Sequence, residues 1–191
     1  MEYSVSTLKT NTIQAATGTS VSVAGGHTIH QAGAVLQVVQ ATKTATVTVS
    51  NGANAGVISQ AITPKFATSK ILIKCSLSLG GGDNSYGYAR LVRQISGQAS
   101  GFIGISDQAS GSQINCSFQC SGKNYTYQSY RTDPRTFEFL DSPNTTTATT
   151  YEVNIACTSD NMYLNRSGTV VTDNVWTPAT MSTLTLMEIA Q

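Results

Sequence analysis

Few side chains in this sequence are of the kinds that perform catalysis or bind metals, and histidine is the scarcest. The two histidines, His27 and His30, lie close together in a glycine-rich stretch. Three copies of such a pair around a threefold axis would offer enough imidazoles for a metal ion, whereas the plainer interpretation is two exposed or interface side chains. We favour the plainer one. Neither histidine accompanies a G-x-S-x-G turn, so the pattern predicts no serine hydrolase, and no metal or cofactor.

Paired carboxylates are the other arrangement with catalytic potential. A glycoside hydrolase needs two of them about 5 to 9.5 Å apart. The ten acidic residues are scattered, and the loop acids that we nominate for such a pair are Asp83 and Asp107. The glycine run that precedes Asp83 lacks the Lys-Ser/Thr pair of a phosphate-binding loop. The sequence therefore predicts a protein without enzymatic activity, and turnover of polysaccharide abolished by Asp83→Ala or Asp107→Ala would overturn that prediction.

The four cysteines are predicted to be reduced core thiols. Cys75 and Cys157 fall in segments where every second residue is apolar, so both should point inward as small hydrophobes. Cys116 and Cys120 are expected on one face of a single strand, about 13 Å apart, too far for a disulfide bond. Reduced thiols suit a protein that is assembled in a reducing cytoplasm.

The elements that must position these residues are strands. Of 191 residues, 11% are charged and 40% hydrophobic, and 27 threonines and 22 serines take the place of charged side chains. The apolar residues alternate with polar ones, and helical periodicity is nearly absent. A net charge of +1 argues against binding to nucleic acid, and no apolar run is long enough for a membrane helix.

The first region, residues 1–34, contains a weak repeat of eight residues. Ile13, Val21 and Ile29 are eight apart, and Leu8 precedes them. Each unit has too few apolar residues to bury a core alone. We therefore predict a β anchor in which three chains wrap around a shared axis, with these four side chains at the attachment or trimer axis. The competing interpretation is a loose arm that is ordered only on a partner.

The second region, residues 35–191, is predicted to be one antiparallel jelly-roll sandwich. Its ten candidate strands are Val35–Val39, Ala45–Val49, Lys70–Leu79, Tyr86–Gln94, Gly101–Ile105, Gln113–Cys120, Arg135–Leu140, Thr149–Cys157, Asn161–Asn165 and Ser182–Ile189. Turn signals such as Asn51-Gly52 and Ser96-Gly97 separate them. The last strand is expected to pair centrally in its sheet.

Several segments, in order, resemble virion proteins of marine and cyanobacterial tailed phages. They are Ser6–Gln14, Gly18–Val23, the "TP-x-x-x-x-SKI" pattern from Thr63 to Ile71, Leu140–Thr146 with Tyr151, Asn165-Arg166-Ser167, and Ser182–Ile189. Each match is weak alone, but the ordered set spans nearly the whole chain. The stretch from Gln94 to Arg135 carries none of these motifs.

The resemblance implies a homotrimeric, non-enzymatic virion component with a jelly-roll knob, assembled in the bacterial cytoplasm. Its partners would be the major capsid protein or a tail or adaptor protein. The short N-terminal region favours a capsid decoration over a short tail-fibre or receptor-binding tip. A stand-alone carbohydrate-binding module is the further alternative. The candidate contacts with a receptor or host glycan are five tyrosines near predicted loops, whose plainer interpretation is half-buried strand residues: Tyr86, Tyr88, Tyr125, Tyr127 and Tyr130.

Overall fold

The structure is a computed structural model that describes residues 31–82, 84–107, 111–121, 130–170 and 175–191. The chain divides into two units, Met1–Gln31 and Ala32–Gln191, and the description concerns the second. The predicted anchor residues Leu8, Ile13, Val21 and Ile29, and both histidines, lie outside the described residues. The anchor and the trimer therefore stay predictions.

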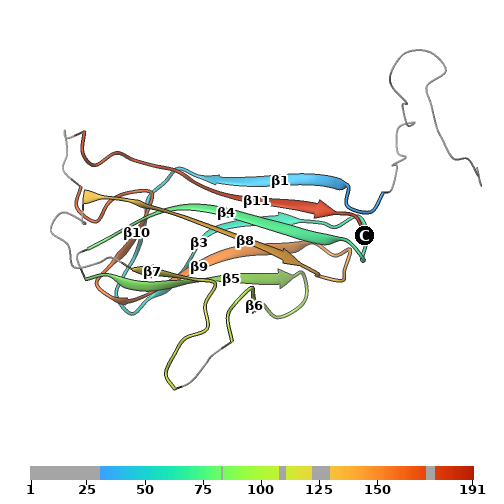
Figure 1. The fold of residues 1–191 in the computed structure, drawn as a ribbon, viewed down its shortest axis with the longest axis horizontal. Coiled ribbons are helices and arrows are strands. Elements are labelled where there is room, and N and C mark those ends of the chain that lie inside the picture. The colour runs from blue at the N-terminus through green and yellow to red at the C-terminus, as the bar shows by residue number, and fades with distance from the viewer. Residues whose placement is uncertain (1–30, 83, 108–110, 122–129, 171–174) are drawn as a thin grey trace, which may run out of the picture. The chain divides into compact units, whose positions relative to one another are not determined.

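The described residues form eleven β-strands in two antiparallel sheets. The strands are β1 (Val35–Lys43), β2 (Val47–Val49), β3 (Asn54–Ile62), β4 (Lys70–Gly81), β5 (Tyr86–Ile95), β6 (Gly101–Ile103), β7 (Phe118–Ser121), β8 (Asp133–Asp141), β9 (Thr149–Ser159), β10 (Met162–Leu164) and β11 (Ser182–Ile189). Sheet A contains β1, β2, β4, β8, β10 and β11, and sheet B contains β3, β5, β6, β7 and β9. Figure 1 shows β1, β11 and β4 side by side in one layer and β9 and β5 in the other.

The strand order is that of a jelly roll. β11 and β10 pair with successive parts of β4, so they act as one broken strand, with β1 and β2 beside it as another. β6 and β7 likewise share β5. If β1 and β2 count as one strand, and β10 and β11 as another, this first strand pairs with this last one. Inside that pair, β3 pairs with β9, β4 with β8, and β5 with β6 and β7. This nested order confirms the predicted fold class.

The core is built by the alternation that the sequence shows. In β4 the odd-numbered residues Ile71, Ile73 and Leu77 are buried, while the even-numbered ones from Lys70 to Ser78 reach the outer surface. β11 lies between β1 and β4, as predicted, with Leu184 and Leu186 fully buried. Side chains from the two inner faces meet to form one hydrophobic core.

Two strand predictions were wrong. β3 was missed because a β-bulge between Gly56 and Ile58 breaks its alternation, so that Val57 and Ile58 are both buried. The predicted strand Gln113–Cys120 begins only at Phe118. Cys116 therefore lies in the preceding loop, half-buried, and does not share a strand face with Cys120.

The cysteines are free thiols in the structure. Cys75, Cys120 and Cys157 are buried as predicted. Burial raises the pKa of the Cys75 thiol to about 11 and that of Cys120 to about 12, from an ordinary value of 9.0. A buried thiol with a raised pKa is protonated at neutral pH and therefore unreactive.

Buried polar groups tie the sheets and loops together. The Asp141 carboxylate of β8 accepts two hydrogen bonds from Arg93 Nη1 of β5, at 2.8 and 3.0 Å, and one from the Tyr151 hydroxyl of β9, at 2.7 Å. Asp141 and Tyr151 are buried, and burial together with the bond to Asp141 raises the pKa of Tyr151. This cluster joins sheet A to sheet B through a charge-assisted network.

Two further buried polar side chains hold loops against sheet A. Asn165, at a φ of 63°, donates to the carbonyls of Lys43 and Ala45 at 2.7 and 3.0 Å. It thereby fixes the junction between β1 and β2. Glu188 accepts from Gln37 Nε2 at 2.6 Å and from the Lys65 backbone N–H at 2.7 Å. Each of these buried polar groups is paired, as buried polar groups in native proteins normally are.

Candidate functional site

The outer face of sheet B carries the candidate site. Along β5 the inward-facing residues Gly87, Ala89 and Leu91 are buried, so the even-numbered residues face outward. In β9 the same holds for Glu152 and Asn154, because Tyr151, Val153 and Ile155 fill the core. Two neighbouring strands therefore present side chains to the same surface, which the segment Ser100–Ile103 borders.

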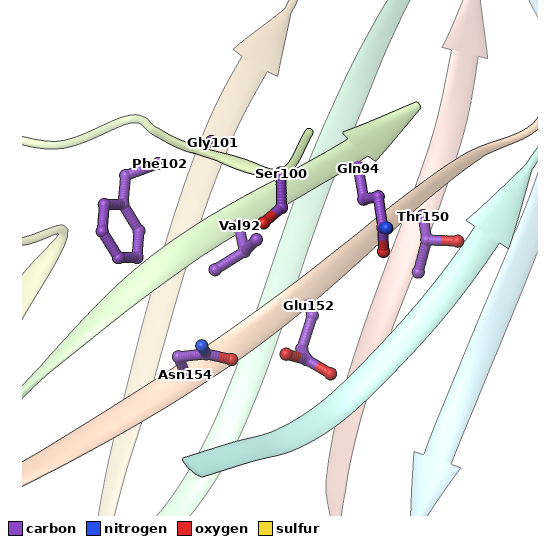
Figure 2. Close-up of a pocket in the computed structure, with 8 residues that line it drawn as sticks. All are labelled: Val92, Gln94, Ser100, Gly101, Phe102, Thr150, Glu152 and Asn154. Carbon is purple, nitrogen blue, oxygen red and sulfur yellow. The ribbon is translucent and has the colours of Figure 1, made fainter. Parts of the chain in front are cut away.

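One groove of about 290 Å³ lies on this face. Figure 2 shows the ring of Phe102 at one end, Gln94 and Thr150 at the other, and Glu152 and Asn154 along one side. Its lining residues come from β5, β9 and the start of β6: Val92, Gln94, Ser100, Gly101, Phe102, Thr150, Glu152 and Asn154. The volume is close to the lower limit of ligand pockets, about 300 Å³.

The polar side chains of this groove are uncommitted. Among the described residues, no hydrogen bond or ion pair involves the side chains of Gln94, Glu152 or Asn154. The Asn154 Oδ1 atom is buried without a partner. Glu152 owes its position to the bulged strand β3, because a Cβ at Gly56 would overlap its carboxyl group. Glu152 thus presents to the groove a carboxylate that has no ion-pair partner among the described residues.

A stacked cation sits beside the groove. The Arg90 guanidinium lies over the Phe102 ring at 4.6 Å and over the Tyr88 ring at 4.8 Å. Its Nε donates to the Asn115 carbonyl at 2.8 Å. These contacts hold the two rings in place through cation–π attraction and leave the Phe102 side chain 45% exposed.

A second hollow, of about 470 Å³, lies farther along β5. Tyr86 and Tyr88 line it, together with Asp107, Ile114 and Asn115 from the loop between β6 and β7. Tyr88 lines this hollow and Phe102 lines the groove, so the Arg90 guanidinium, which contacts both rings, lies between the two. The groove and the hollow together form one strip on the outer face of sheet B, with aromatic rings, amides and carboxylates.

The comparisons with known proteins return distant similarity only. No model of a known protein family matches the chain, and no curated protein matches it. Among solved structures, the Gt strain of infectious bursal disease virus is 10% identical with a TM-score of 0.43, covering 90% of this chain and 42% of that one. The VP2 subviral particle and the Gx strain of that virus, at 10% and 11% identity, each give a TM-score of 0.37.

The VP2 subviral particle match covers 81% of this chain and 38% of that chain, and the Gx match covers 82% and 37%. The chain thus spans less than half the length of all three structures. Similarity at this level does not extend from the fold to what the chain does.

The structure places the predicted contact residues unevenly. Tyr86 and Tyr88 lie together on the outer face of sheet B, where Tyr86 is 44% exposed. Tyr130 is half-buried and is not among the residues that line the two hollows, while Tyr125 and Tyr127 lie outside the described residues. Asp107 lines the second hollow, and Asp83 lies outside the described residues.

Sequence reasoning missed the other half of this strip, namely Phe102, Glu152 and Asn154. The signal available was the alternation in Thr149–Cys157, which predicts that residues 152 and 154 face away from the core. The pairing of β9 with β5, which brings these residues near Phe102, needed the structure. Within the described ranges, no three His, Cys, Asp or Glu side chains are grouped to hold a metal ion, and no helix is long and apolar enough to cross a membrane.

Proposed function

We propose that this chain is a non-enzymatic structural protein of a bacteriophage virion, a homotrimeric surface knob that decorates the capsid and is attached by its N-terminal segment. Jelly rolls occur in capsid proteins and in lectins alike, so the fold alone does not decide this. The observation that carries the proposal is a row of apolar side chains across the outer face of sheet A.

The apolar row crosses four strands. Val38 of β1 pairs with Met187 of β11, Met187 pairs with Leu72 of β4, and Leu72 pairs with Leu140 of β8. All four side chains point away from the core, because the adjacent residues that belong to or pack against the core lie on the opposite face of each strand: Val39, Leu186, Ile71, Ile73 and Phe139. Val38 and Leu140 are 54% and 47% exposed. A contiguous apolar patch on a protein surface favours contact with another protein.

The rest of the outer face of sheet A carries hydroxyl groups and few charges. Four residues farther along the strands, Thr42, Thr183, Ser76 and Thr136 form a row of hydroxyls in the same register. Between the two rows, the Lys74–Glu138 ion pair, at 2.9 Å, is the only ion pair between described residues on this face. A face of hydroxyls and apolar groups can be buried against a second copy of the chain without desolvating many charges.

The row lies near the end of the sandwich at which the chain enters. Gly33 donates a backbone hydrogen bond to the Ala190 carbonyl, and Val35 pairs with Ile189, so the first and last described residues share that end (Figure 1). The described part of the chain therefore begins close to the apolar row. Trimer contact and particle attachment at one end would leave the opposite end, at the β4–β5 connection, facing solvent.

Two measurements test this proposal. Light scattering of the purified protein should give the mass of three 20.1 kDa chains, and immunogold labelling of intact phage should place the knob on the head. A monomer at micromolar concentration would overturn the trimer. Virions without label would overturn the virion assignment itself.

A short tail-fibre or receptor-binding tip is the second candidate, and the groove with uncommitted polar groups on sheet B favours it. The two roles differ in phage that lack the protein. Loss of a decoration should weaken capsids towards heat while adsorption survives. Loss of a receptor-binding tip should abolish adsorption and leave capsid stability unchanged.

A further inference from the structure

We propose that the groove on the outer face of sheet B, between Phe102 and the side chains of Glu152 and Asn154, binds a neutral saccharide. This inference goes beyond the structural role proposed above and does not depend on it. It rests on three features of the groove: an exposed aromatic ring held from one side, polar groups without partners, and the absence of a cation among its lining residues.

The Phe102 ring provides the apolar platform. Its contact with the Arg90 guanidinium fixes its orientation, while nearly half of its surface stays exposed beside the groove. One face of a pyranose ring carries C–H groups, and their positively polarised hydrogens are attracted to the negative face of an aromatic ring. Val92 extends this apolar surface along β5. A preorganised ring costs little conformational entropy on binding.

The polar groups match sugar hydroxyls in kind. A hydroxyl donates one hydrogen bond and accepts others. The Glu152 carboxylate can accept from hydroxyls, and the amides of Gln94 and Asn154 can both donate and accept. In the same protein, the buried polar side chains Asp141, Asn165 and Glu188 are all paired internally. Among the buried side-chain oxygens that lack a partner in the described residues, Asn154 Oδ1 belongs to the groove and Asn115 Oδ1 to the second hollow.

The Asn154 Oδ1 atom is the unused acceptor in the groove. It is buried and lacks a partner. A buried polar atom without a hydrogen bond costs about 1–3 kcal/mol, so such atoms in native structures call for an explanation. A ligand hydroxyl in the groove would supply one, after a small rotation of the amide.

The charges at the groove indicate which class of saccharide it can bind. Glu152 is the only ionisable side chain among the lining residues, and Arg90 is engaged with Tyr88, Phe102 and the Asn115 carbonyl. The Arg90 guanidinium beside the groove and the Glu152 carboxylate within it add up to no net charge, so an acidic polysaccharide or a phosphate would meet no excess of positive charge. The groove therefore fits neutral sugars. The second hollow, across the Arg90 stack, offers Tyr88 and Asn115 to further residues of the same oligosaccharide.

The test is a titration of the ¹⁵N-labelled full chain with four neutral trisaccharides: maltotriose, cellotriose, mannotriose and chitotriose. At least one should bind with a dissociation constant of about 1 mM or lower, and the shifted signals should include the Gly101 and Phe102 amides and the Asn154 side chain. Phe102→Ala and Glu152→Gln should each weaken binding about tenfold or more. Trp176→Ala, which removes an exposed ring on another loop, should leave binding unchanged.

Three results would overturn the inference. One is the absence of shifts with all four trisaccharides up to about 10 mM, ten times the expected constant. Another is binding that neither Phe102→Ala nor Glu152→Gln weakens, since the sugar would then occupy another surface. The third is tighter binding of a heparin-derived trisaccharide than of any neutral one. Thermal unfolding of each variant verifies that it is folded. None of these readouts depends on the oligomeric mass or on virions. The saccharide site can therefore be refuted while the proposed structural role stands, and the reverse.

Discussion

Replacement of Asp141 by asparagine tests whether the buried charged cluster holds the two sheets together. Asp141→Asn keeps the size of the side chain but removes the charge that accepts two bonds from Arg93 and one from Tyr151. The guanidinium then loses its partner, and the tyrosine hydroxyl, which is fully buried, faces an amide instead of a carboxylate.

The magnitude follows from the burial of the partners. Removing one member of a buried ion pair costs about 3–5 kcal/mol, mostly because the other charge is left unpaired. The Arg93 side chain is 28% exposed and that of Asp141 7%, so water can partly solvate the orphaned guanidinium. We therefore expect the lower end, about 3 kcal/mol. For a domain of this size that lowers the melting temperature by about 6–12 °C.

Urea unfolding and calorimetry measure this, with Glu138→Gln as the matched control. That variant breaks the Lys74–Glu138 pair, whose side chains are 45% and 58% exposed, and should cost less than about 1 kcal/mol. Tyr151→Phe should cost about 1 kcal/mol, and less in the Asp141→Asn background. Equal stability of Asp141→Asn and Glu138→Gln would refute the argument that the cluster bridges the sheets.

Three further outcomes are expected. Leu140→Asp places a charge in the apolar row and should convert the proposed trimer to monomers by light scattering, whereas Gln98→Asp, on the exposed loop between β5 and β6 of the other sheet, should not; dissociation by both would remove the special role of the row. Stability should fall as the pH rises above 9, because the unfolded thiols ionise at 9.0 while the folded pKa values of Cys75 and Cys120 are about 11 and 12, so that the unfolded state binds fewer protons there. Unfolding titrated with urea at pH 8 and pH 10 should show this loss, and Cys120→Ala should reduce it; an unchanged pH dependence would contradict the burial of that thiol. Asn165→Ala should be less stable than Asn165→Gly by about 1 kcal/mol, since glycine tolerates the φ of 63°; the reverse order in a thermal melt would contradict the backbone strain.

The sequence predicted the fold class and most strands because β4, β9 and β11 alternate cleanly between core and surface. Its failures have local causes. The bulge at Gly56 places two adjacent apolar residues in the core and hides the period of β3. In the segment from Gln113 to Cys120 the apolar residues alternate as in a strand, but only its end pairs with β5.

The site was predictable only in part. Tyr86 and Tyr88 were recognised as candidates because both lie beside a connection rich in glycine, serine and asparagine. Phe102, Glu152 and Asn154 come from different parts of the chain and meet only through the pairings of β5 with β6 and β9. Alternation shows which side of a strand a residue faces, but it does not show which strand lies beside it.

The nested strand order has a consequence for how the protein is made. β1 pairs with β11, so Val35 finds its partner only at Ile189. During synthesis, sheet A cannot close until the last strand has left the ribosome, and at about 5–20 residues per second the earlier strands wait for about 8–30 s with open edges. Contacts so distant in sequence also make folding slow. The emerging chain therefore passes through a stage at which aggregation competes with folding, and a chaperone that shields the edge of β4 would raise the yield of folded protein.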